Sequence, residues 1–235
     1  AKNALGVAAA CAVAGIIVGV VSLTGLGLGL TDIVISIAGN NIYLAMGLTI
    51  VASILMGLAM PTTAKYIIVS TVTAPILVSG FGVPLLAAHL FVLYYAILAD
   101  DTPPVGVAAY AAAGIARSDP WKTGWMGFKY DISGMLIPVI FVLAPALVLV
   151  DATVLGVIKI LISTSIGLIS MAGFLQNWLV TKCRWYERIL LLASALFLVS
   201  PILVLDFVGF AILAAIWWLQ KQRAALTTEL ATEPA

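Results

Sequence analysis

Long apolar runs, interrupted at a few points by proline, glycine or charge, dominate this chain. A helix needs about 20 apolar residues to cross the roughly 30 Å hydrocarbon core of a bilayer. Single runs of that length predict membrane spans, whereas longer blocks must contain an interruption. The runs and blocks are Gly6–Leu30, Tyr43–Gly82, Pro84–Ala116, Ile132–Val150, Val154–Phe174 and Ile189–Leu219.

Two of these blocks are interrupted near their centres, at Met60–Thr63 and at Asp100–Pro104. Backbone that leaves a helix inside hydrocarbon exposes N–H and C=O groups, each at a cost of several kcal/mol, unless protein or a water-filled cavity supplies partners. Free carbonyls at the end of one half-helix can hold a hard cation such as Na⁺, and the N–H groups that start the next suit a carboxylate. Paired interruptions therefore predict a transporter site, although a lone proline more often only kinks a packed helix.

Composition supports a membrane protein and excludes other classes. The chain is 63% hydrophobic and 9% charged, with a net charge of +1 and a mean hydropathy of +1.21. These values exclude a soluble domain, a disordered tail and a nucleic-acid binder. Cys11 and Cys183 lie far apart and predict neither a disulfide framework nor a metal site. Catalytic and nucleotide-binding motifs are absent, which argues against an enzyme.

Positive residues orient the predicted spans. By the positive-inside tendency, two basic clusters place their loops in the cytoplasm: Arg117, Lys122 and Lys129, and Lys182, Arg184 and Arg188. The loops at Thr31–Ile42 and Phe81–Val83 and the turn at Asp151 carry no basic residue and are assigned to the outside.

This orientation requires Tyr43–Gly82 to start and finish on the outer side. No basic cluster lies near Pro61, so a re-entrant helical hairpin fits better than two full spans. In the last run, a single span would place Lys221 and Arg223 outside. A second hairpin, or two short spans bent at Pro201, would keep them inside, and we favour the bent pair.

Charged residues inside the membrane are functional candidates by default. Asp100 or Asp101 could pair with Lys65, bind Na⁺ or carry a proton, and Lys65 could instead extend toward a polar vestibule. For Lys159 near a helix end we favour such snorkelling, and Asp206 is expected at an interfacial turn.

The single histidine, His89, lies in an apolar run. A proton relay is possible there in chemical terms, but we favour a packed, hydrogen-bonded side chain.

With both interruptions in place, the sequence resembles a known family. Gly57–Ile67 is similar to the GxxxPTTAxYI hairpin segment of fused permeases of the tripartite ATP-independent periplasmic (TRAP) transporters, in the branch whose solute receptor is called TAXI. The resemblance covers roughly Ala4–Leu149 and is specific as a set. Further matching segments are Ser22–Gly27, Ala88–Phe91, Thr102–Val105 and Ala108–Ala116.

The resemblance implies an all-α integral membrane fold, an elevator-type secondary transporter built from two inverted repeats. This chain would supply the second repeat over residues 1–150, with the re-entrant hairpin at 43–82 and the broken helix at 84–116. Residues 151–223 would form a C-terminal transmembrane extension and 224–235 a polar tail. Because the chain opens on Ala1 and shows one repeat, we expect it to be a fragment or a split subunit, with the N-terminal half of the permease elsewhere.

The same resemblance implies the site residues. The ion ligands would come from Gly57, Met60, Pro61, Thr62, Thr63, Asp101, Thr102, Pro103, Pro104 and Gly106. The substrate contacts would come from Thr62, Thr63, Lys65 and Asp100. Relatives often carry uncharged residues before Thr-Pro-Pro, so the aspartates here keep both Na⁺ and H⁺ open as coupling ion.

The expected function is therefore cation-coupled uptake of an organic acid, which a periplasmic TAXI-type solute-binding protein delivers. The chain would be a multi-pass protein of a bacterial or archaeal cytoplasmic (inner) membrane, with no cofactor besides the coupling ion. The alternative is a non-transporting membrane scaffold or assembly subunit whose breaks are structural kinks.

Overall fold

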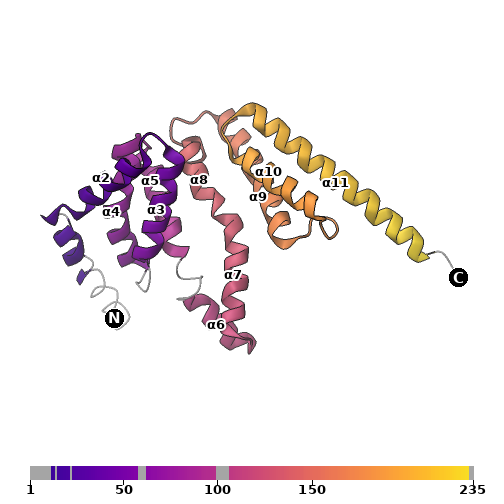
Figure 1. Ribbon diagram of the computed structural model, residues 1–235, viewed down its shortest axis with the longest axis horizontal. Helices are drawn as coiled ribbons and strands as arrows, with labels where there is room; N and C mark the ends of the chain where they lie inside the picture. The colour runs from indigo at the N-terminus through magenta and orange to yellow at the C-terminus, as the bar shows by residue number, and fades with distance from the viewer. Residues whose placement is uncertain (1–11, 14, 22, 58–61, 99–105, 233–235) are drawn as a thin grey trace. The chain divides into compact units, whose positions relative to one another are not determined.

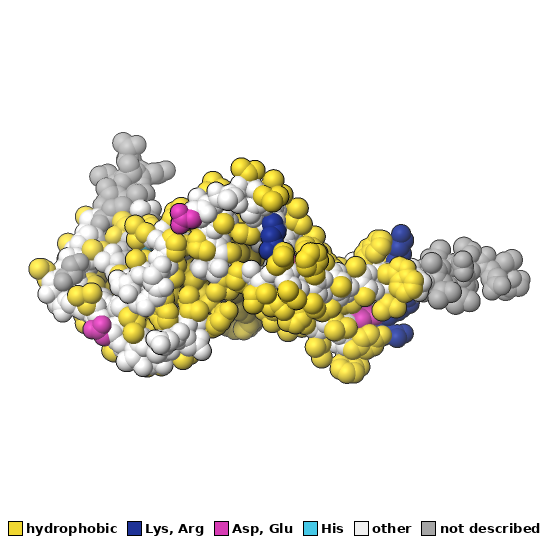
Figure 2. Space-filling model, turned by 90° about the horizontal axis from the view of Figure 1, so that it is seen from above, with side chains coloured by type: hydrophobic (Ala, Val, Ile, Leu, Met, Phe, Trp, Pro, Cys, Tyr) yellow, Lys and Arg dark blue, Asp and Glu magenta, His cyan; other side chains and the backbone are white. Residues whose placement is uncertain are grey.

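A computed structural model describes residues 12–13, 15–21, 23–57, 62–98 and 106–232. These residues are helical, without a named strand, and they divide into two compact units, Ala1–Asp131 and Ile132–Ala235. Four of the helices described are long and apolar enough to cross a membrane. Hydrophobic side chains cover much of the face that Figure 2 shows, and charged ones are few. The chain is an all-α membrane protein, as the sequence predicts.

The first unit contains α2 (Leu26–Ala38), α3 (Ile42–Gly57), α4 (Thr62–Phe81), α5 (Leu85–Leu98) and α6 (Val107–Ala116). In it, α4 packs against α2, α3 and α5, as Figure 1 shows. Hydrogen bonds between polar side chains link α4 to α3 and to α5. Ser53 Oγ and Thr73 Oγ1 lie 3.3 Å apart between α3 and α4, and Tyr66 Oη lies 2.9 Å from His89 Nδ1 between α4 and α5. Buried hydroxyls are thus hydrogen-bonded inside the unit, as an apolar surrounding requires.

The block predicted as a re-entrant hairpin contains α3 and α4, which pack side by side. Its tip lies outside the described residues, and α4 alone is long and apolar enough to cross a membrane, so the re-entrant form stays a prediction. The predicted break at Asp100–Pro104 lies outside the described residues, with α5 ending at Leu98 before it and α6 beginning at Val107 after it. Gly106 immediately precedes α6 with a positive φ of 45°, a left-handed conformation that favours glycine. His89 is packed and hydrogen-bonded, in agreement with the interpretation favoured from the sequence.

The first run differs from the prediction of one span at Gly6–Leu30 followed by a loop at Thr31–Ile42. Helical residues Gly15–Val21 and α2 meet at a bend of 61°, and Gly25 there has φ +68°. The helix then continues to Ala38. The Thr31 hydroxyl donates a hydrogen bond to the Gly27 carbonyl (2.9 Å), so this polar residue is accommodated within the helix. A polar residue that is satisfied within its own helix does not mark a boundary.

The predicted span Ile132–Val150 is also displaced. The apolar helical stretch runs from Pro120 to Leu143, as α7 (Pro120–Gly134) and α8 (Leu136–Leu143), and η1 (Pro145–Val148) follows. The Asp119 carboxylate accepts a hydrogen bond from the Lys122 N–H (2.9 Å), so Asp119-Pro120 is a helix start. Pro145 disfavours helical backbone at the residue before it, which ends α8.

The second unit also contains α9 (Val154–Gln176), α10 (Trp185–Val199) and α11 (Leu203–Thr232). α10 packs against both α9 and α11. Small residues allow this close approach: a Cβ on Gly209 would lie 3.1 Å from the Ser194 carbonyl oxygen. The Ser194 hydroxyl donates to the Gly209 carbonyl at 2.8 Å. Close packing at small residues and hydrogen bonds between helices are the usual means of association in a bilayer.

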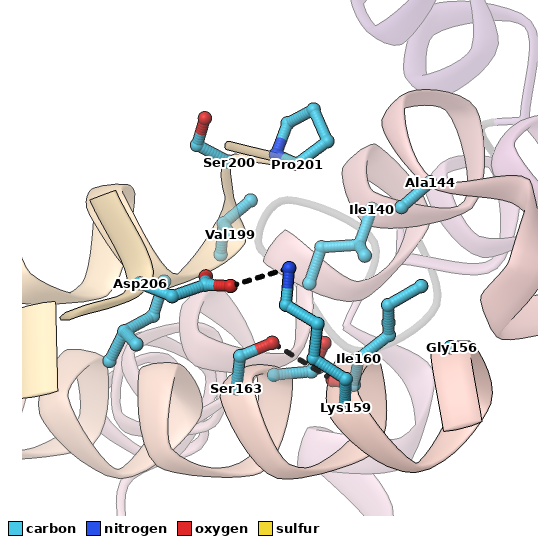
Figure 3. A pocket seen from close by; sticks show the side chains of 12 residues that line it. Ile140, Ala144, Gly156, Lys159, Ile160, Ser163, Val199, Ser200, Pro201 and Asp206 are labelled. Carbon is cyan, nitrogen blue, oxygen red and sulfur yellow. Dashed lines mark hydrogen bonds and ion pairs between the residues drawn. The ribbon is translucent and has the colours of Figure 1, made fainter. Parts of the chain in front are cut away.

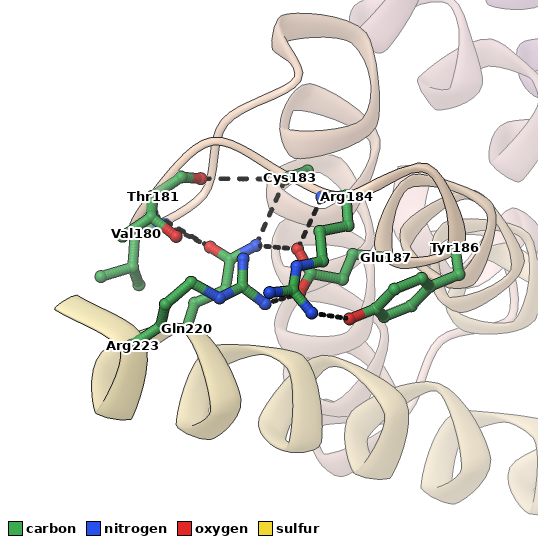
Figure 4. Close-up of polar contacts among 8 residues, drawn as sticks. All are labelled: Val180, Thr181, Cys183, Arg184, Tyr186, Glu187, Gln220 and Arg223. Carbon is green, nitrogen blue, oxygen red and sulfur yellow. Dashed lines mark hydrogen bonds and ion pairs between the residues drawn. The ribbon is translucent and has the colours of Figure 1, made fainter. Parts of the chain in front are cut away.

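A polar network joins Gln220 and Arg223 of α11 to the segment before α10 and to its first turn (Figure 4). The Glu187 carboxylate is paired with Arg223 and accepts hydrogen bonds from Gln220 Nε2 (2.9 Å) and the Arg184 N–H (2.8 Å). Gln220 Oε1 accepts from the N–H groups of Val180 and Thr181, each at 3.0 Å. These contacts place residues 220–223 of α11 beside the loop that precedes α10. The last run is interrupted between Val199 and Leu203, near the predicted Pro201, and the assignment of the two helices as short spans stays a prediction.

The order of helices in the second unit predicts which of its loops lie on the same side of the membrane, and cysteine labelling tests this. In a Cys11→Ser, Cys183→Ser background, single cysteines replacing Lys182 and Gln222 should react with an impermeant maleimide from one side of oriented vesicles. Cysteines replacing Asp151 and Ile202 should react from the other side, because α9 crosses once and the α10–α11 pair returns. Reaction of all four positions from the same side would contradict the topology.

Candidate functional site

Three helix ends come together in the first unit. α3 ends at Gly57, α4 begins at Thr62 and α5 ends at Leu98. A Cβ built on Gly57 would lie 2.7 Å from the carbonyl oxygen and 3.2 Å from the Cα of Ala96, two residues before the end of α5. Such a contact is possible only without a side chain. The C-terminal ends of α3 and α5 are therefore adjacent.

The electrostatics of this meeting point are mixed. The last carbonyls of α3 and α5 have no partners in their own helices and carry the negative ends of two helix dipoles. The first N–H groups of α4 carry a positive end beside them. Carbonyl oxygens suit a hard cation, and helix-start N–H groups suit a carboxylate. The arrangement can hold both signs of charge within one small region.

Thr62 and Thr63 form the start of α4, and both are exposed. Their side chains can therefore reach a ligand. Gly106 is buried, with the left-handed backbone described above, at the start of α6. Seven of the predicted site residues lie outside the described residues: Met60, Pro61, Asp100, Asp101, Thr102, Pro103 and Pro104.

Lys65 lies in the first turn of α4 and is 0% exposed. Its ammonium group is therefore not exposed to solvent. A helix start disfavours a positive side chain, and burial disfavours any charge that is not compensated. Both costs are reduced where carbonyl oxygens or carboxylates gather. Lys65 thus indicates negative potential at the same place as the helix ends.

Some contacts around the site were not expected from the sequence. The approach of Gly57 to Ala96 depends on how two helices cross, and the hydrogen bond to His89 is made by Tyr66, the residue directly after Lys65. The only sequence signal for the first contact is a glycine at a helix end followed by a proline, which also fits a simple turn. Among the residues that the structure describes, no group of three or more His, Cys, Asp or Glu side chains could hold a metal ion.

Comparison with protein families gives a match over residues 1–156 to the DctM component of the tripartite ATP-independent periplasmic transporters. The match covers the first unit, with the three helix ends, and extends into α9. The chain belongs to this family. The DctM component is part of a transporter, so the chain is a membrane transport protein and not an enzyme. Comparison with curated proteins and with solved structures gives no match.

Family membership confirms the TRAP permease resemblance of the sequence, and it implies a periplasmic solute-binding partner and other transporter components. Residues beyond 156 lie outside the match. Most of the second unit, with α10 and α11, is therefore an addition to the part that the family describes.

The close contact at Gly57 provides a matched pair of variants in one helix of this DctM-type chain. Gly57→Ala should destabilise the protein by about 1–3 kcal/mol, because the new Cβ forces α3 away from α5. Gly47→Ala, where a Cβ meets nothing within 4 Å, should be neutral or stabilising by up to about 1 kcal/mol. Thermal unfolding in detergent measures both. Equal effects would contradict the close approach.

Proposed function

We propose that this chain is the part of a TRAP permease that binds the coupling cation and the substrate, and that the permease takes up an organic acid on a cation gradient. The observation that carries the proposal is the meeting of the α3, α4 and α5 ends at Gly57 and Ala96. The hairpin tip and the helix break would form one site there. Met60, Pro61, Thr62 and Thr63 would contribute from the tip, and Asp101, Thr102, Pro103, Pro104 and Gly106 from the break.

Na⁺ is the cation that we favour. The ends of α3 and α5 supply backbone carbonyls, and threonine hydroxyls 62 and 63 add further oxygen ligands. Oxygen donors are what hard cations prefer, and interrupted helices of transporters use them for Na⁺. Asp100 and Asp101 keep a proton as the alternative coupling ion, since intramembrane carboxylates also serve as proton carriers.

The substrate carboxylate would be held by the start of α4 and by Lys65. N–H groups at a helix start and a lysine side chain both bind anionic oxygen. Lys65 would pair with Asp100 when substrate is absent, which accounts for a buried ammonium group at an otherwise unfavourable position. The substrate would be an organic acid that a TAXI-type receptor delivers from the periplasm, across the cytoplasmic membrane of a bacterium or archaeon.

Two substitutions test the ion site. In the permease assembled with every chain that it needs, Thr63→Ala or Pro103→Ala should lower cation-driven uptake by at least about tenfold, which corresponds to the loss of roughly 1.4 kcal/mol of binding. Membrane insertion should persist. Ser36→Ala, which removes an exposed hydroxyl of α2, is the control and should transport normally. Unchanged uptake in both site variants would contradict the assignment.

The driving ion is measured in the same vesicles. An inward Na⁺ gradient at equal pH should drive uptake, and a pH gradient without Na⁺ should not. The reverse result would assign the coupling to the aspartates and overturn the preference for Na⁺.

Cysteine accessibility separates a transporter from a scaffold. Cysteines replacing Thr62 and Asp101 should react with water-soluble reagents, and Na⁺ or substrate should slow the reaction at both positions, because a transport site is hydrated and closes on its ligands. Rates that respond to neither ligand would favour the scaffold whose breaks are only structural.

A further inference from the structure

An ion pair in the second unit lies beyond the residues that the DctM description matches. Lys159 in α9 and Asp206 in the first turn of α11 approach with Nζ 3.0 Å from Oδ2. The sequence predicts each residue near a helix end but not their pairing, and the Asp206 side chain is buried. The Asp206 side chain is 6% exposed and that of Lys159 is 41% exposed. The pair therefore joins a buried carboxylate to a cation that remains open to a ligand.

Asp206 has unused hydrogen-bonding capacity. Its second carboxylate oxygen, Oδ1, is buried and has no hydrogen-bond partner among the residues that the structure describes. A buried charged oxygen without a donor is unfavourable, so an orphaned atom of this kind needs an explanation. A bound group with N–H donors would supply one.

A cavity of about 200 Å³, with a mainly apolar lining and a few polar side chains, lies beside the pair (Figure 3). α8, α9 and the linker between α10 and α11 surround it. The side chains of Lys159, Asp206, Ser163 and Ser200 line it together with apolar residues. It is larger than a single water site, and its polar groups include one cation and one anion.

An apolar groove of about 300 Å³ adjoins this cavity through Lys159, Ser163 and Asp206. α9 and α11 both pack on α10 but contact each other little, which leaves the groove between them. The groove is lined by Leu155, Ile158, Ile162, Leu203, Phe207 and Phe210. A charged pocket thus continues directly into an apolar channel.

The depth of the pair in the membrane fits a lipid headgroup. Lys159 lies about 7.5 Å along the axis from the start of α9 at a rise of 1.5 Å per residue, and Asp206 is the fourth residue of α11. Both therefore lie near the ends of membrane-crossing helices, on the side opposite to the basic 182–188 loop. Headgroups and the first acyl carbons occupy this level.

We propose that this place binds a phospholipid with a primary amine headgroup, phosphatidylethanolamine. Its ammonium group would donate to Asp206 Oδ1, its phosphate would accept from the exposed side of Lys159, and one acyl chain would lie in the groove between α9 and α11. The headgroup carries one positive and one negative group, as the cavity does. A choline headgroup has no N–H to donate, and the glycerol headgroup of an anionic lipid has no cation for Asp206. This proposal is independent of the transport site.

Headgroup methylation tests the proposal on the wild-type protein. The purified protein is exchanged into detergent with phosphatidylethanolamine, its mono- and dimethyl derivatives, phosphatidylcholine or phosphatidylglycerol, and retained lipid is counted by native mass spectrometry. Phosphatidylethanolamine should be retained about fivefold to tenfold more than phosphatidylcholine, as expected for one charge-assisted hydrogen bond. Equal retention of these two lipids, or strongest retention of phosphatidylglycerol, would overturn the proposal.

Two variants and a control locate the effect. Asp206→Asn should reduce the ethanolamine preference to near one, whereas Asp151→Asn, which alters an exposed acid of the same unit, should leave it unchanged. Ile162→Trp fills the groove and should reduce the retention of all lipids alike. A preference that survives Asp206→Asn would contradict the site. Free phosphoethanolamine should not compete, and competition at the concentration of the lipid would show that the acyl groove has no role.

Discussion

Helix ends that lie within a membrane need partners for their free N–H and C=O groups, and the candidate site depends on that requirement. In the first unit the need arises at the ends of α3, α4 and α5, which the contact of Gly57 with Ala96 brings together. The same free groups that would be unfavourable against lipid are ligands for a cation and for a carboxylate. The burial of Lys65 beside them is consistent with a region built around charge.

The second unit handles its charged groups differently. There the chain forms nearly continuous helices, which small residues bring close, and its charges are placed near the helix ends. Glu187 pairs with Arg223 and Gln220 at one end of the apolar stretch of α11 (Leu203–Ala224), and Asp206 pairs with Lys159 at the other. Charge near a helix end is less costly than charge at the bilayer centre. This unit therefore has the features of a stable anchor, in contrast to the interrupted helices of the first.

Much of this organisation could be predicted from the sequence, because apolar length and proline position act locally. The helices α3 and α4, the start of α6 after Gly106 and the interruption of the last run near Pro201 follow from such signals. The helix bounds near Gly25 and Pro120 differ from the predicted ones. In the first case a polar residue predicts a loop, but Thr31 donates a hydrogen bond inside its own helix and does not end it. The pairing of Lys159 with Asp206 and the Gly57–Ala96 contact could not be predicted, because both depend on how separate helices pack in three dimensions.

The central claim is that the hairpin tip and the helix break bind one Na⁺ together. Amide hydrogen exchange of peptides covering residues 54–66 and 95–108, compared in Na⁺ and in choline at one pH, tests this most directly. The account predicts that exchange in both peptides slows with the same dependence on Na⁺ concentration, while peptides from α10 are unaffected. Slowing in only one of the two peptides, or in neither, would contradict it.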